Sequence, residues 1–176
     1  MNDSPYSSAL QEWAAVAGYA LNPDNEAWVF HTPGWGQRFY LRSTDALTLT
    51  YAERGDSEQS LISASSIIDI ERFLTVLFGD DIRSNRHLDR ISCASKPTEL
   101  CPTCQTFTDE NNKLTLVDAY GQVRAFFLAP LSLSDDVIWF SWILDASLDD
   151  LRASFLAPDG LPLFPGLRIG PARESA

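Results

Sequence analysis

Four residues in the middle of the sequence carry side chains that could bind a metal ion. They are His87, Cys93, Cys101 and Cys104. Imidazole and thiolate groups are the ligands of tetrahedral structural zinc sites. Such sites usually contain two closely spaced ligand pairs, whereas here only Cys101 and Cys104 form one. The spacing therefore argues against zinc, and we expect neither a metal nor another cofactor.

Cys101 and Cys104 also form a C-x-x-C motif, which is typical of thiol redox sites. In those sites the first cysteine lies at a helix N-terminus, where the helix dipole lowers the pKa of its thiol. The residues that follow here include the polar run Asp109–Asn112 and have no helical pattern. The sequence therefore favours buried or loop thiols without a chemical role.

The sequence lacks the residue combinations that hydrolases and nucleotide-binding proteins use. A nucleophilic Ser or Cys needs a neighbouring base, and the only imidazoles belong to His31 and His87. No G-x-S-x-G motif occurs, and Gly34-x-Gly36 lacks the third glycine of a dinucleotide-binding loop. We therefore predict that the protein is not an enzyme.

Recognition of a protein partner is the chemistry that the remaining polar and aromatic residues favour. The stretch Glu53–Gln59 contains the tripeptide Arg54-Gly55-Asp56, which we interpret as the tip of an acidic hairpin that extends beyond a sheet. Trp35 lies between two glycines, where it either folds back on the core or projects as an interface anchor. The candidate partner-binding residues are Trp35, Glu53, Arg54, Asp56, Glu58 and Gln59.

Charge and length narrow the class of partner. With 24 acidic and 13 basic side chains, the 176-residue chain has a formal net charge of −11. This charge argues against nucleic-acid binding, which depends on Lys and Arg to replace phosphate counterions. No apolar run reaches the roughly 18 residues of a membrane span, and the N-terminus lacks the basic region of a secretory signal. We expect a cytoplasmic protein with a single domain over residues 1–176.

Three helices are expected to pack against a sheet. The patterns place them within Ser8–Gly18, Ser66–Gly79 and Ser147–Phe155. In each, a serine offers an N-cap side chain, and in the first two a glycine offers the left-handed conformation that ends a helix. Apolar residues recur three and four positions apart, so each helix presents one apolar face.

Short β-rich runs separated by turn residues predict a mainly antiparallel sheet. The first four runs form a meander because the linkers between them are short, and Asn22–Asn25 is expected to be the turn that precedes it. Two later runs flank Asp118–Gly121 as a hairpin. The six runs are Ala27–Thr32, Arg38–Arg42, Leu47–Glu53, Gln59–Ala64, Leu114–Val117 and Val123–Leu128.

The rest of the chain has fewer periodic signals. We expect a short strand near His87–Ile91 and then a loop to Lys113. Val137–Leu144 is apolar on both faces, which predicts a central strand that is covered on both sides. The tail from about residue 157 is rich in proline and should be irregular. Together the elements predict an α+β fold, in which N-terminal, central and short C-terminal helices pack on an antiparallel meander.

Three segments resemble a known family. They are Trp13–Tyr19, Gln37–Arg42 and Ile70–Arg83, which share a pattern of aromatic residues, glycines and arginines over the first half of the chain. In this pattern the chain is similar to actinobacterial immunity proteins that neutralise secreted polymorphic toxins, most closely the immunity factors for tuberculosis necrotizing toxin.

The resemblance implies a cytosolic antitoxin that binds the catalytic domain of an NAD(P) glycohydrolase and blocks access of the dinucleotide. It implies a monomer that forms a heterodimer with the toxin, and no catalytic residues. An acidic protein can complement the electropositive pocket that holds a pyrophosphate. Two alternatives remain open on the residues alone, a non-catalytic adaptor or secretion chaperone and a small zinc-binding protein.

Overall fold

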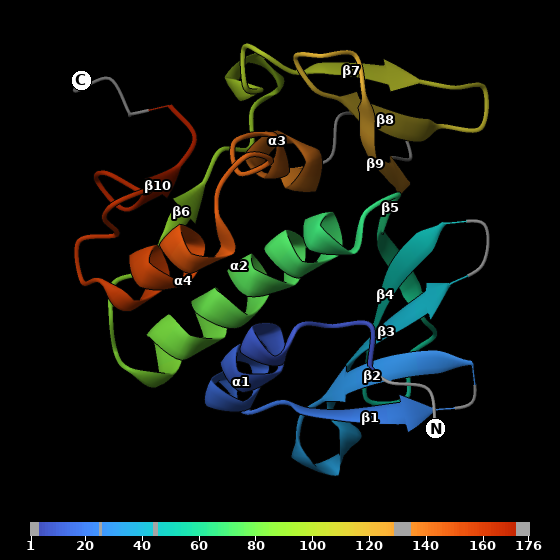
Figure 1. The fold of residues 1–176 in the computed structure, drawn as a ribbon, viewed down its shortest axis with the longest axis vertical. Helices are drawn as coiled ribbons and strands as arrows, with labels where there is room; N and C mark the ends of the chain where they lie inside the picture. The colour runs from blue at the N-terminus through green and yellow to red at the C-terminus, as the bar shows by residue number, and fades with distance from the viewer. Residues whose placement is uncertain (1–3, 25, 44–45, 129–134, 172–176) are drawn as a thin grey trace.

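The computed structural model describes residues 4–24, 26–43, 46–128 and 135–171. Within these residues an eight-stranded antiparallel sheet carries the helices on one side and leaves its other side uncovered (Figure 1). The strand order is β1-β2-β3-β4-β5-β9-β8-β7. The α+β prediction with a mainly antiparallel sheet is therefore confirmed.

The strands agree closely with the β-rich runs of the sequence. The four predicted meander strands and the later hairpin are present, with ends within one residue of the expected ones. β5 joins the meander to the hairpin by pairing Ser63 with Phe126 and Ala64 with Ala125. The strands of this sheet are β1 Ala20–Asp24, β2 Ala27–His31, β3 Gln37–Ser43, β4 Leu47–Glu53, β5 Gln59–Ala64, β7 Gln105–Thr108, β8 Lys113–Val117 and β9 Val123–Leu128.

Two strands of the sheet were not predicted. β1 occupies most of the expected turn Asn22–Asn25, of which Asn25 lies outside the described residues. Pro23 is tolerated there because β1 is an edge strand, where the missing N–H faces away from the ladder. β7 lies inside the segment that was expected to be a loop up to Lys113, and it pairs with β8.

The first helix, α1 Ser8–Ala17, begins and ends almost as predicted. Its N-cap is Ser7 rather than Ser8, and the Ser7 hydroxyl accepts a hydrogen bond from the Leu10 N–H. Gly18 ends the helix in the left-handed region with φ of 95°, which a glycine adopts without steric cost. The buried carboxylate of Glu71 accepts hydrogen bonds from both the N–H and the hydroxyl of Ser7, which fixes α1 to the central helix.

The central helix, α2 Ile67–Asn85, is longer than predicted. Ser66 caps it as expected, but Gly79 lies inside the helix and does not end it. A Cβ atom at Gly79 would lie 2.4 Å from the ring of Phe155 in α4 Leu148–Leu156. A glycine is therefore required at position 79 because α2 and α4 approach each other closely there.

The prediction of a central strand over Val137–Leu144 is wrong. The segment begins as a helix, α3 Asp135–Ser141, with Asp135 and Asp136 in its first turn. Every residue from Val137 to Ser141 is buried, because the helix is covered on all sides. A short run that is apolar on every face does not distinguish a buried helix from a buried strand.

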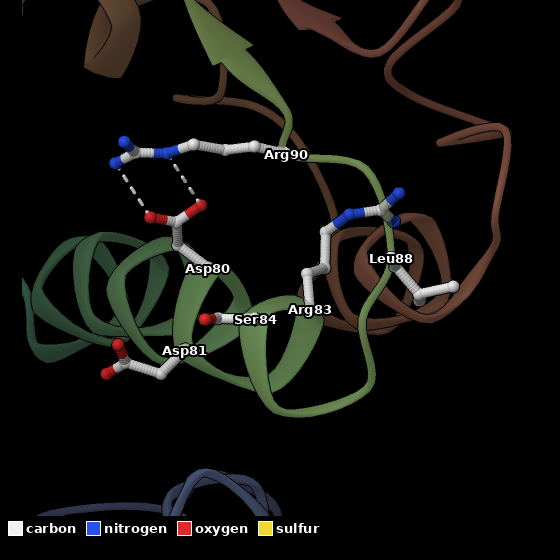
Figure 2. A pocket seen from close by; sticks show the side chains of 6 residues that line it. All are labelled: Asp80, Asp81, Arg83, Ser84, Leu88 and Arg90. Atoms are coloured by element: carbon white, nitrogen blue, oxygen red, sulfur yellow. Dashed lines mark hydrogen bonds and ion pairs between the residues drawn. The ribbon is translucent and has the colours of Figure 1, made fainter.

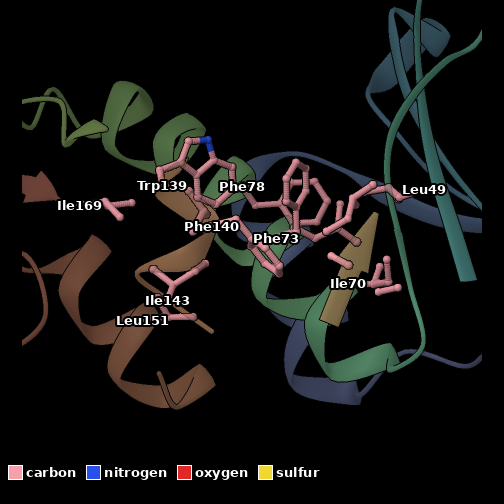
Figure 3. Close-up of a cluster of buried hydrophobic side chains, with 14 of the residues drawn as sticks. Leu49, Ile70, Phe73, Phe78, Trp139, Phe140, Ile143, Leu151 and Ile169 are labelled. Atoms are coloured by element: carbon pink, nitrogen blue, oxygen red, sulfur yellow. The ribbon is translucent and has the colours of Figure 1, made fainter. Parts of the chain in front are cut away.

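One large apolar core joins the inner face of the sheet to the helices (Figure 3). Phe30 and Phe39 from the sheet meet Phe78 of α2 at ring-centroid distances of 5.2 and 5.8 Å. Further along α2, Phe73 packs on Trp139 and Phe140 of α3. The aromatic residues of α2 thus hold both halves of the sheet on one core.

The C-terminal part differs from the prediction in two places. The expected strand near His87–Ile91 is wrong, since the strand in this region is β6 Ser92–Cys93. β6 pairs in parallel with β10 Arg168–Ile169, a two-residue strand in the tail after Ala157. The rest of the described tail is irregular, as its prolines predicted.

Candidate partner-binding surface

Two turns meet at one end of the meander and bring the candidate residues together. The β2–β3 connection contains the short 3-10 helix η1 Pro33–Trp35, and the β4–β5 connection contains Arg54. The Arg54 N–H donates to the Gly36 carbonyl at 2.6 Å. The Arg54 carbonyl in turn accepts a hydrogen bond from Arg38 Nη2. We call residues 33–36 and 53–59 the turn pair.

Trp35 lies flat on the sheet at the turn pair instead of entering the core. Its indole ring stacks on the His31 imidazole with a centroid distance of 4.1 Å and an interplanar angle of 3°. Its side chain remains 42% exposed. The Trp35 N–H donates to the Thr32 carbonyl at 3.0 Å, which fixes the turn. The ring is thus held rigid with one face available to a partner.

His31 is held by hydrogen bonds on both sides of its ring. Nδ1 lies 3.1 Å from the Thr32 carbonyl, and Nε2 lies 2.6 Å from the Asn22 side-chain nitrogen. A carbonyl only accepts, so we assign the proton to Nδ1 and the acceptor role to Nε2. His31 is therefore a satisfied sheet residue that supports Trp35, and it is not poised as a catalytic base.

The outer face of the sheet carries an arginine and tyrosine cluster that sequence reasoning missed. The Arg38 and Arg42 guanidinium carbons lie 6.0 and 5.4 Å from the centroid of the Tyr40 ring. Tyr40 also belongs to a small apolar cluster on this face, apart from the main core. The alternation of Arg38, Tyr40 and Arg42 along the strand was the sequence signal that could have indicated this cluster. Trp, Tyr and Arg are the residues that most often dominate binding energy at interfaces.

Glu58 is engaged with the sheet, unlike the tip of its hairpin. Its carboxylate accepts hydrogen bonds from Arg42 Nη2 at 2.5 Å and Thr50 Oγ1 at 2.6 Å. Partial burial acts to raise the pKa of Glu58, but the bonds from Thr50 and Arg42 outweigh it and hold the pKa below its usual range. Glu58 therefore stays ionised at neutral pH and neutralises Arg42.

The other candidate residues of this hairpin point to solvent. Asp56 and Gln59 are exposed, and no described residue pairs with the Asp56 carboxylate. Glu53 accepts a hydrogen bond from the Tyr51 hydroxyl at 3.2 Å. The turn pair thus presents both an exposed carboxylate, Asp56, and the fixed indole of Trp35. A surface that combines an acidic group with an aromatic anchor suits a basic protein partner.

The cysteine and histidine candidates do not form a metal site. No three His, Cys, Asp or Glu side chains in the described ranges are grouped so that they could hold a metal ion. Burial raises the pKa of the Cys104 thiol to about 11, so this thiol stays protonated at neutral pH. Its Sγ lies 3.7 Å from the Ser141 carbonyl, while the Cys101 N–H donates to the Ser141 hydroxyl. The loop that carries Cys101 and Cys104 is therefore anchored on α3.

Replacing both Cys101 and Cys104 with Ser is expected to lower the melting temperature by less than about 5 °C. A serine hydroxyl at position 104 can still donate to the Ser141 carbonyl, so the cost is on the order of 1 kcal/mol, or about 2–4 °C for a chain of this size. Thermal melting with and without a chelator measures both effects. A fall of tens of degrees in either comparison would contradict the structural interpretation of this loop.

A pocket of about 300 Å³ near the end of α2 is an alternative candidate site (Figure 2). The Asp80 carboxylate pairs with Arg90 across it at 2.8 Å. The guanidinium of Arg83, which also lines it, donates four hydrogen bonds to backbone carbonyls. Ser84 supplies the hydroxyl of the lining, and the lining residues include no His or Cys. The lining therefore offers no nucleophile with a neighbouring base.

None of the helices in the described part of the chain has the length and apolarity that crossing a bilayer requires.

Comparison with known proteins gives one consistent result. A family model described as Immunity protein 61 matches residues 13–163. This match extends well beyond the segments on which the sequence resemblance rested.

Relatives and a solved structure agree with the family model. The chain is 29% identical over 167 residues to the Immunity factor for TNT of Mycobacterium tuberculosis, which covers 90% of this chain and 92% of that protein. A homolog from Mycobacterium bovis BCG has the same identity and coverage. The structure of Rv3902c from M. tuberculosis matches with a TM-score of 0.77 and 28% identity, over 91% of this chain and 94% of that chain.

Proposed function

Because the chain belongs to the Immunity protein 61 family, we propose that it binds the catalytic domain of a secreted NAD(P) glycohydrolase toxin and blocks substrate access to the toxin's active site. The match of the family model to residues 13–163 carries this proposal. In this role the protein has no turnover of its own and acts as a monomer that forms a one-to-one complex with the toxin. It works in the cytoplasm of the producing cell, where the NAD pool needs protection.

Charge supports this choice of partner. A pocket that binds the pyrophosphate of a dinucleotide needs positive potential, and the net charge of −11 favours encounter with such a pocket. Complementary charge mainly raises the association rate and selects against wrong partners. The affinity itself must come from desolvated anchors.

The turn pair supplies both kinds of group. Trp35 is an aromatic anchor that its stack on His31 holds in place, so little side-chain entropy is lost when a partner covers it. Asp56 can accept charge-assisted hydrogen bonds from lysines or arginines of the toxin pocket. The carboxylate of Glu58 is already committed to Arg42 and Thr50, and its role is to hold the hairpin on the sheet.

The direct test is inhibition of NAD hydrolysis. The purified protein is titrated against the catalytic domain of tuberculosis necrotizing toxin and against any toxin catalytic domain that a neighbouring gene encodes. Complete inhibition at a one-to-one ratio is expected with the neighbouring toxin. Failure to bind or inhibit either toxin refutes the proposal, as does hydrolysis of NAD by the protein alone.

Replacing Trp35 with Ala is expected to weaken toxin binding by about 30-fold or more, because truncation of an aromatic hot spot costs at least about 2 kcal/mol. The matched control is Tyr120→Ala, since Tyr120 is also exposed, at 85%, but lies in the β8–β9 turn. Calorimetric titration measures both variants, and melting curves verify their folds. Equal affinity of the two variants for the toxin would show that the toxin contacts a surface other than the turn pair.

A further inference from the structure

The two edges of the eight-stranded sheet are protected to different degrees. β1 at one edge contains Pro23 and Asp24, and proline or charge on an edge strand hinders pairing with another chain. β7 at the other edge has the sequence Gln-Thr-Phe-Thr over Gln105–Thr108, with neither proline nor charge. Its pairing with β8 has no register shift. β7 is therefore the edge that can accept a further strand.

The register shows which backbone groups of β7 are available. The Asp109 N–H donates to the Lys113 carbonyl, which makes this a hydrogen-bonded pair of the β7–β8 ladder. Hydrogen-bonded and non-bonded pairs alternate along an antiparallel ladder. Phe107 opposite Thr115 is therefore bonded to β8, whereas Thr106 and Thr108 direct their N–H and carbonyl groups to the free edge. No described residue bonds to these groups.

Exposed apolar side chains lie on β7 and on the sheet face next to it. Phe107 is 57% exposed and Leu128 of β9 is 63% exposed. Lys113 Nζ lies 3.7 Å from the centroid of the Phe126 ring, so its stem also covers this face. An added strand would pair with the free N–H and carbonyl groups of β7, and it would also cover the exposed ring of Phe107. Main-chain pairing with an adjacent side-chain pocket is the general pattern of recognition by strand addition.

Phe107 lies on the same face of the sheet as the arginine and tyrosine cluster. The cross-strand pairs run from Arg42 through Thr48, Ser63, Phe126 and Thr115 to Phe107, and directly paired residues share a face. Five strand spacings of about 4.8 Å separate Arg42 from Phe107, roughly 24 Å in all. A standard interface covers about 800 Å² on each partner, or roughly 30 Å across. One partner can therefore contact Phe107 and the arginine and tyrosine cluster at the same time.

Charge decides which strand fits. The turn after β7 begins with Asp109 and Glu110, and the whole chain has a net charge of −11. A second copy of this chain would bring like charges together, whereas a basic segment is attracted. We propose that an extended, basic segment of the toxin's catalytic domain adds to β7 as a ninth strand of the sheet. This inference rests on the proposed function and specifies a second contact for the same partner.

Proline substitution tests the inference because it removes only the outward N–H groups. Thr106→Pro and Thr108→Pro each delete a donor that β8 does not use, whereas Thr106→Ala and Thr108→Ala keep it. The proline variants are expected to bind the neighbouring toxin domain about 10- to 100-fold more weakly than wild type, and the alanine variants within about 3-fold of it. Melting curves establish that each variant is folded.

Hydrogen exchange on the wild-type complex gives a second measurement that needs no variant. The amides of Thr106 and Thr108 should become protected when the toxin binds, while the Phe107 amide is protected in both states. If wild type binds the toxin but these amides stay unprotected, or if folded proline and alanine variants bind equally, the inference is wrong and the proposed function stands. If wild type binds no toxin, both fail. A wild-type dimer that the proline variants abolish overturns the choice of partner.

Discussion

The Arg83→Met variant is expected to lose about 3–5 kcal/mol of unfolding free energy. Among the described residues Arg83 is the largest fully buried side chain, with 0% exposure, and it donates to carbonyls of four residues. Those carbonyls belong to Asp89, Phe155, Ala157 and Pro158, at distances from 2.6 to 3.1 Å. Met fills much of the volume but donates nothing, so the buried Phe155 carbonyl and three partly buried carbonyls lose the donor that Arg83 supplies.

The position of these carbonyls explains why a cation is used. Phe155 and Ala157 are at the C-terminal end of α4, where carbonyls have no donor within the helix and the helix dipole favours positive charge. Burial acts to lower the pKa of Arg83, and the charges of Asp89, Asp80 and Asp159 oppose this effect. The guanidinium remains charged throughout the accessible pH range.

Urea denaturation measures this prediction, with Arg86→Met as the matched control. Arg86 is exposed at the C-cap of the same helix, so its loss removes one positive charge and should cost less than about 1 kcal/mol. Arg83→Lys should fall between the two variants, because an ammonium keeps the charge but cannot reach all four carbonyls. Equal denaturation midpoints for the two Met variants would show that the carbonyl cluster is hydrated.

The Arg124→Met variant is expected to lose about 2–4 kcal/mol of unfolding free energy, because it removes one partner of a largely buried ion pair. Arg124 in β9 donates through Nε and Nη2 to the two oxygens of Asp69 at 3.1 and 2.9 Å. These bonds raise the pKa of Arg124 above its ordinary value. Asp69, almost fully buried, keeps Arg72 as a partner at 2.8 Å, which limits the loss.

Arg124 also connects elements that are distant in sequence. Its guanidinium donates to the Leu144 carbonyl at 3.0 Å and lies 3.3 Å from Asp118. It thereby fixes β9 to the first turn of α2 and to the segment between α3 and α4. The loss of Arg124 should therefore loosen the hairpin on which β7 rests.

A control pair separates this effect from the simple loss of a charge. Arg90→Met breaks an ion pair in which the arginine side chain is 81% exposed, and such pairs contribute about 1 kcal/mol or less. In the double variant Asp69→Asn/Arg124→Met, part of the lost stability should return, because no buried carboxylate then remains underpaired. Denaturation midpoints of Arg124→Met and Arg90→Met that coincide would refute the prediction.

The meander could be predicted because its signals are local. Alternation within β2 to β5 and turn residues between them determine the strands and their antiparallel order. The juxtaposition of Trp35 with Glu53–Gln59 follows, since the two connections leave the sheet at the same end. The role of each side chain did not follow, because the bonds of Glu58 to Arg42 and Thr50 cross from one strand to another.

The errors arose where tertiary contacts decide the local structure. Gly79 has the residue type of a helix end, yet it is required inside α2 by the ring of Phe155, which is distant in sequence. Val137–Leu144 has no polar face because α3 is covered on all sides. Pro23 indicates a turn by itself and becomes compatible with a strand only at the edge of the sheet.

The junction between β5 and β9 has a consequence for the order of folding. Neighbouring strands of the meander close loops of only a few residues, whereas the partners in the pairs Ser63–Phe126 and Ala64–Ala125 are roughly 60 residues apart in sequence. Contacts between residues so far apart in sequence cost more chain entropy before they contribute stability. Such contacts therefore slow folding. We therefore expect the meander to form before the three strands β9, β8 and β7 dock on it, so that the free edge at β7 is completed last.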